Sequence, residues 1–152
     1  MLKNLRDILN RALSNAEQDT VEGREHALRL ATATLLVEVM RADYKEDVTE
    51  NKVMFEQLKR FFELTEDEAS LLIEDAKKKA DHAVSLQAFT RLLHERLTLT
   101  EKHLVIEMLW RVAMADDELD KHEDYVVRKV ADLLYISHKD LIRIRNVVRE
   151  FG

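Results

Sequence analysis

The residues best suited to chemistry are acidic ones that recur with the same spacing at two places. The pattern A-D-x-x-x-D-x-x-E covers residues 42–50 and returns at residues 115–123. Clustered carboxylates supply the hard oxygen ligands that calcium, magnesium and manganese prefer. The sequence therefore predicts candidate sites for a divalent cation, with ligands Asp43, Asp47 and Glu50 in the first acidic turn and Asp116, Asp117, Asp120 and Glu123 in the second.

The second turn is the denser of the two, but it is not an EF-hand. Lys121 stands where that loop needs its turn glycine, and Val127 stands where it needs a bidentate glutamate. Helix capping explains the same residues without a metal, because Asp120 would be the N-cap of the next helix and acidic side chains suit the start of a helix. We therefore rank helix capping above cation binding at both turns.

Other reaction chemistry has little support in the sequence. The chain has no cysteine, which excludes disulfides, thiolate catalysis and Cys-ligated metals. His94-Glu95 begins like the zinc-hydrolase motif, but Thr98 stands where the second histidine belongs. There is no glycine-rich phosphate loop and no nucleophile elbow. We predict a protein that is not an enzyme; the alternative is a metal-assisted enzyme that uses the carboxylates of the acidic turns.

The elements around these turns are predicted to be helices in one globular domain. The 152 residues include no proline and only two glycines, whereas sheet-rich folds depend on both for their turns. Thr65-x-x-Glu68 and Thr98-x-x-Glu101 are capping boxes. The expected seven to eight helices cover residues 2–13, 25–42, 49–62, 65–81, 85–97, 98–115 and 120–134 and a last segment from Ser137, with residues 14–24 as a polar linker and 25–152 as the main domain.

The acidic turns belong to a longer repeat. Displacing the chain by 73 places Leu36 on Leu109, and after a one-residue slip Phe61-Phe62 falls on Leu133-Leu134. The sequence therefore predicts an all-α fold of two pseudo-twofold-related halves, with the two most apolar helices packed together. Glu38 and Arg111 occupy equivalent positions in those helices. Either they pair in the interior, where an unpaired charge would be costly, or each points to a solvated edge.

Three segments resemble the tellurite-resistance TerB family, and we therefore call them TerB-like. They are Leu30–Asp43, Leu109–Asp116 continued by Leu119-Asp120-x-x-Glu123, and Val130–His138. The resemblance implies two related helical halves, kinship with the N-terminal domain of the DjlA co-chaperone, and divalent-cation binding by the acidic turns. It also implies a non-enzymatic role in tellurite or stress resistance. The family's glycine after A-D is replaced here by Tyr44 and Asp117.

Charge and hydropathy bear on location and partners. The net charge of −6 argues against nucleic acid as the partner. The longest apolar run, residues 30–37, is far shorter than the roughly 20 residues that span a bilayer, and the first residues do not form a secretory signal. We therefore expect a cytoplasmic binding or scaffold module with protein partners in a stress-related or membrane-associated assembly, and leave its oligomeric state open.

Overall fold

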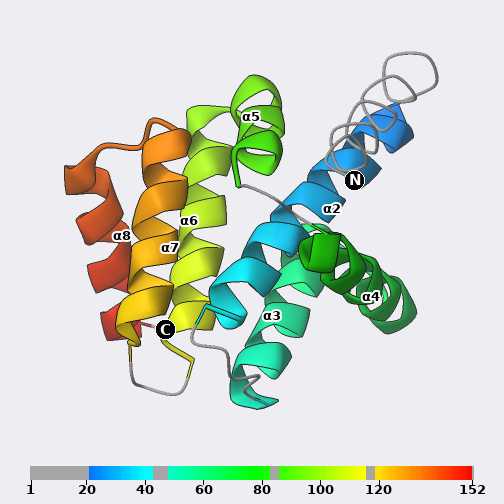
Figure 1. Cartoon of the computed structure of the whole chain (residues 1–152), viewed down its shortest axis with the longest axis horizontal. Helices are drawn as coiled ribbons and strands as arrows, with labels where there is room; N and C mark the ends of the chain where they lie inside the picture. Colours follow the sequence, from blue (N-terminus) through cyan, green and yellow to red (C-terminus); the bar gives the residue numbers. More distant parts are fainter. Residues whose placement is uncertain (1–20, 43–47, 83–85, 116–118, 152) are drawn as a thin grey trace.

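The computed structural model describes residues 21–42, 48–82, 86–115 and 119–151. Within these ranges the chain forms seven α-helices and no strand, which confirms the predicted all-α fold (Figure 1). The predicted helix over residues 2–13 and most of the linker lie outside the described residues. The helices are α2 (Val21–Met40), α3 (Val48–Phe61), α4 (Glu66–His82), α5 (Gln87–Arg96), α6 (Leu99–Ala113), α7 (Lys121–Leu133) and α8 (His138–Phe151).

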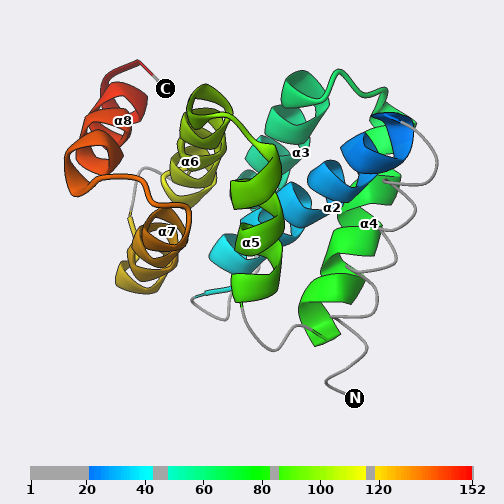
Figure 2. The same ribbon diagram turned by 90° about the horizontal axis from the view of Figure 1, so that it is seen from above.

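The helices form two halves with matching contacts. In the first half α2, α3 and α4 pack on one another, and in the second half α6, α7 and α8 do the same. The halves meet where α2 packs against α6, as predicted, and α3 also reaches α6 as α7 reaches α2 (Figure 2). The contact of α3 with α6 thus has its counterpart in the contact of α7 with α2, as a pseudo-twofold arrangement requires.

The two central helices are buried because their apolar residues surround the helix instead of forming one stripe. On α2 every residue from Leu30 to Met40 is buried except Glu38. On α6 only the outer face keeps contact with solvent, and Trp110 is completely buried. The indole Nε1–H of Trp110 donates a hydrogen bond of 3.2 Å to the carbonyl of Leu141, which ties α6 to α8.

A second repeated feature lies at the ends of α3 and α7. Glu63 and Tyr135 have positive φ values of 53° and 60°, which place both in the left-handed region just after their helix. Two residues that occupy the same point of the repeat therefore share an uncommon conformation. Each belongs to a C-terminal motif closed by a 2.9 Å bond from an N–H to the carbonyl five residues earlier, from Leu64 to Lys59 and from Ile136 to Ala131.

The predicted caps fix where several helices begin. Thr65 and Glu68 form the expected reciprocal bonds at the start of α4, of 2.9 and 3.2 Å. The box formed by Thr98 and Glu101 does the same at α6. One helix start was predicted wrongly: α2 begins at Val21, so residues 21–24 are helical and not linker. A single glycine at position 23 lowers helix stability by only about 1 kcal/mol, which a 20-residue helix tolerates.

The structure places Glu38 and Arg111 at two separate, partly exposed positions. Arg111 pairs with Glu107 one turn away on α6, at 3.4 Å. Glu38 lies in the fields of Arg41 and Asp81, which form an ion pair between α2 and the end of α4. The hypothesis of an interior Glu38–Arg111 pair is therefore wrong, and the solvated alternative is correct. Each side chain therefore lies at a partly exposed edge of its helix. Arg111 pairs with Glu107 there, and Glu38 lies near Arg41 and Asp81.

The environment of Glu38 makes the stability of the fold depend on pH. Burial raises the pKa of Glu38, Arg41 lowers it and Asp81 raises it, with a net upward shift. A carboxyl whose pKa is raised in the folded state stabilises the fold below its unfolded pKa and loses that contribution as pH rises through the folded value. We expect Glu38→Gln to raise the melting temperature at pH 7 and to change it little near pH 3.5.

Thermal melts at both pH values check this expectation. Glu74→Gln is the matched control, because Glu74 is an exposed glutamate on α4. An equal shift for Glu38→Gln at pH 3.5 and at pH 7 would show that packing, and not ionisation, determines the effect.

Candidate functional site

The helix ends that flank the two acidic segments lie at the same edge of the molecule. Figure 1 shows the C-terminal ends of α2 and α6 and the N-terminal ends of α3 and α7 together there. The described residues on either side of both acidic segments therefore lie on one side of the fold. Of the seven predicted ligands, the structure describes three, Glu50, Asp120 and Glu123, whereas Asp43, Asp47, Asp116 and Asp117 lie outside the described residues.

Glu50 and Glu123 are buried at equivalent points of the repeat. Their exposed fractions are 1% and 2%, and each lies in the first turn of its helix, α3 or α7. A carboxylate at this depth requires hydrogen bonds, an opposite charge or a bound cation to offset its desolvation. Both glutamates are therefore anchored in the core at the first turns of α3 and α7.

The burial of these glutamates could have been found from the sequence. Glu50 begins a series with Met54 and Leu58, spaced four residues apart, and both of these side chains are completely buried. Glu123 precedes Val127 by the same spacing. Because residues four apart share a helix face, a glutamate in register with an apolar stripe is expected to point inward.

Asp120 is the N-cap of α7, as the capping interpretation predicted. Its Oδ1 accepts the backbone N–H of His122 at 2.7 Å and lies 3.1 Å from Nδ1 of the same residue. The backbone N–H of His122 lowers the pKa of Asp120, because that bond favours the ionised carboxylate. Asp120 therefore stays ionised at neutral pH with part of its acceptor capacity in use.

The described carboxylates do not by themselves form a metal centre. Among the residues that the structure describes, no three histidine or acidic side chains gather as ligands around one point. Glu50 comes from the first turn and Asp120 and Glu123 from the second, and the aspartates between the helices are outside the description. The geometry shows two anchored glutamates and one capping aspartate, and cation binding stays a prediction.

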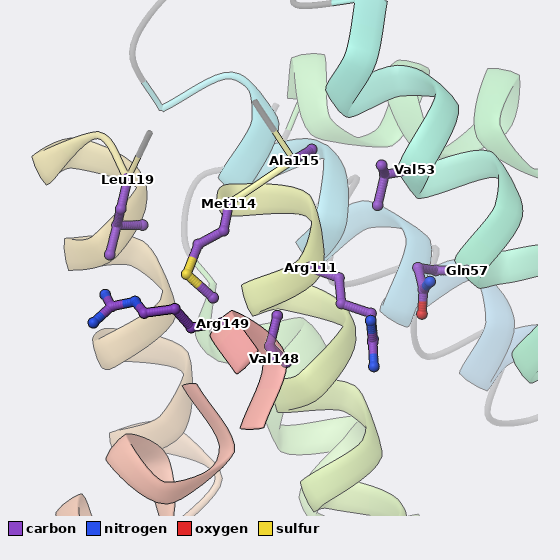
Figure 3. A pocket seen from close by; sticks show the side chains of 8 residues that line it. All are labelled: Val53, Gln57, Arg111, Met114, Ala115, Leu119, Val148 and Arg149. Carbon is purple, nitrogen blue, oxygen red and sulfur yellow. The ribbon is translucent and has the colours of Figure 1, made fainter. Parts of the chain in front are cut away.

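A groove of about 350 Å³ lies beside the second acidic turn, and no sequence pattern predicted it. Figure 3 shows it over the C-terminal end of α6, with α3 on one side and α8 on the other. Its walls come from three helices far apart in the chain, which is why only the tertiary structure reveals it. Its lining side chains are Val53, Gln57, Arg111, Met114, Ala115, Leu119, Val148 and Arg149.

Together these features define a class: a duplicated all-α domain in which an acidic turn follows the central helix of each half. The family profile described as Tellurite resistance protein TerB matches residues 29–146. The chain belongs to this family, which confirms the resemblance drawn from its motifs. Comparisons with curated proteins and with solved structures gave no significant match.

The length and apolar character of the described helices decide whether any of them could cross a membrane. None of them combines the length and the apolar character required to cross a bilayer. This agrees with the prediction that the described part of the chain does not span a membrane.

Proposed function

We propose that this chain is a non-enzymatic TerB-type binding module whose acidic turns bind a divalent cation. The observation that carries the proposal is the matched burial of Glu50 and Glu123, at 1% and 2% exposure, at one edge of the fold. Each anchored glutamate lies three residues after an aspartate of the repeated pattern, Asp47 or Asp120. Calcium takes six to eight oxygen ligands, so a turn with several fixed carboxylates suits it.

The second turn is the stronger candidate. Asp116, Asp117 and Asp120 add three carboxylates to Glu123 within eight residues. Asp120 uses one oxygen for the helix cap, and a carboxylate accepts more bonds than that one. Calcium is the first cation to test, with magnesium and manganese as alternatives because all the ligands are hard oxygens. In the cell, we propose a role in the response to stress or tellurite. The chain would act in the cytoplasm through protein partners, including partners in membrane-associated assemblies.

The alternative of a metal-assisted enzyme has less support. Such an enzyme needs its carboxylates in a concave site beside a polarising group. The groove next to the second turn holds Arg111 and Arg149, but none of its described lining residues is acidic. No described carboxylate therefore lines the concave surface. This arrangement favours binding over catalysis as the function.

Calcium should raise the melting temperature of the wild-type protein if the second turn binds it. A ligand that binds only the folded state stabilises it by RT ln(1 + [L]/Kd), or about 2.7 kcal/mol at one hundred times Kd. For a domain of this size we expect a rise of roughly 5–10 °C at that concentration. The Asp116→Asn/Asp120→Asn double variant should lose most of this rise. Thermal melts with calcium and with chelator, at constant ionic strength, measure it.

The matched control is Asp67→Asn, which removes an exposed aspartate from the first turn of α4. It should keep the full calcium response. Calorimetric titration of the wild type with calcium and magnesium then gives the stoichiometry and identifies the preferred ion. An unchanged wild-type melting temperature in millimolar calcium, magnesium and manganese would leave the acidic turns as helix starts alone.

A further inference from the structure

The pseudo-twofold arrangement is broken by α5. This helix packs against α2 and α7, and Figure 2 shows it on that side of the molecule. The pseudo-twofold counterpart of this pair is formed by α6 and α3, which likewise come from different halves. In the described part of the chain no helix covers that pair as α5 covers α2 and α7. Among the described helices, one central helix is therefore covered on its outer face by α5, and no described helix takes that place on the other.

Equivalent residues on α2 and α6 show the difference directly. Ala31 on α2 is completely buried, whereas its counterpart Leu104 on α6 is 41% exposed. Thr34 on α2 is completely buried, whereas the side chain of its counterpart Glu107 is 33% exposed. The outer face of α6 thus presents a large apolar side chain to solvent at a position that the first half covers.

This open face leads along α6 into the groove of about 350 Å³. Arg111, one turn beyond Glu107, belongs to both surfaces. Farther along, Met114 at the end of α6, Val53 on α3 and Val148 on α8 line the groove (Figure 3). The combined surface thus mixes apolar side chains with the two arginines, a pattern that suits an amphipathic helix laid into a groove.

The charges around this surface differ in sign from the chain as a whole. The protein has a net charge of −6, yet the helices that form the two walls, α3 and α8, each carry more basic than acidic residues. Arg111 and Arg149 line the groove itself. On α8 the basic residues outnumber the acidic ones by four to two. They are Lys139, Arg143, Arg145 and Arg149, compared with Asp140 and Glu150. Complementary charge across an interface sets its specificity and its rate of association.

We propose that this groove and the open face of α6 bind an amphipathic helix of a partner protein that carries acidic residues beside its apolar stripe. Its apolar side chains pack on Met114, Val53 and Val148, and its carboxylates pair with Arg149 and compete with Glu107 for Arg111. Leu119 is followed directly by Asp120, so that end of the groove repels a carboxylate. The proposal rests on the binding-module function but does not require a bound cation.

The test begins with a display library of 14-residue helical peptides in which the apolar stripe is fixed and the flanking positions vary between acidic, neutral and basic residues. Selection uses the full chain in the presence of chelator, so that a failure here is distinct from a failure of cation binding. We expect acidic sequences to be enriched. Fluorescence anisotropy of a selected peptide should then show at least tenfold weaker binding to Arg149→Glu and to Arg111→Glu, with less than a twofold change for Arg91→Glu.

Arg91 is the matched control because its side chain is 78% exposed on α5, away from the groove. A second measurement does not rely on variants: the methyl resonance of Met114 should shift on peptide binding, whereas those of Met40 and Met54 in the core should not. No enrichment, enrichment of basic peptides, or binding that ignores both arginine reversals overturns the proposal. So does a concentration-dependent dimer abolished by those reversals, since the occupant would then be a second copy.

Discussion

Trp110→Ala should be among the most destabilising single substitutions in this protein, at about 3–5 kcal/mol. Trp110 is completely buried where α6 meets α8, and its indole N–H bonds the carbonyl of Leu141. Removal of the ring leaves a cavity and deletes the hydrogen bond that ties the two helices. Because ordinary domains are stable by only 5–15 kcal/mol, we expect the melting temperature to fall by about 10 °C or more.

Trp110→Phe separates the two contributions. The smaller ring fills much of the cavity but cannot donate to Leu141, so its cost should be clearly smaller than that of Trp110→Ala. Tyr125→Ala is the control for loss of an aromatic side chain at an exposed site, since Tyr125 is 63% exposed on α7. Urea unfolding of the four proteins gives the free energies. A Trp110→Ala variant as stable as Tyr125→Ala would place Trp110 outside the core.

The fold was largely predictable because local capping patterns in the sequence indicate where several helices begin. Thr65 and Thr98 each precede a glutamate at the spacing that makes reciprocal cap bonds, and both boxes form. The repeat also carried long-range information, since two equivalent and strongly apolar helices were expected to pack against each other, and α2 and α6 do so. The start of α2 was missed because Gly23 was taken as a stop, whereas one glycine only weakens a helix.

The functional surfaces were less predictable, for two different reasons. The buried state of Glu50 and Glu123 was encoded in their register with the apolar stripes, but acidic side chains are mostly exposed, and these two were considered only as metal ligands or as part of a helix start. No local sequence pattern indicates the groove. Val53, Arg111 and Val148 come from three helices, and their contact depends on how α3 and α8 flank α6. The error over Glu38 and Arg111 has the same origin, because sequence symmetry gives equivalence and not proximity.

The same symmetry yields the second large prediction. Leu36 and Leu109 are equivalent residues on α2 and α6, and both are completely buried. Replacing either with alanine removes three carbon atoms from the core between the halves and should cost about 2–5 kcal/mol. The double variant should lose at least about 4 kcal/mol if the sites are independent, which is a large part of the stability of an ordinary domain. Urea unfolding monitored by circular dichroism at 222 nm measures all three variants.

The control removes the same atoms from a leucine at the surface. Leu71 on α4 is 61% exposed, so Leu71→Ala should change the free energy of unfolding by no more than about 0.5 kcal/mol. If Leu36→Ala and Leu109→Ala both lower stability by several kcal/mol while Leu71→Ala does not, each half contributes its central helix to one shared core. If only one of them does, the two helices are equivalent in sequence but not in the packing that holds the halves together.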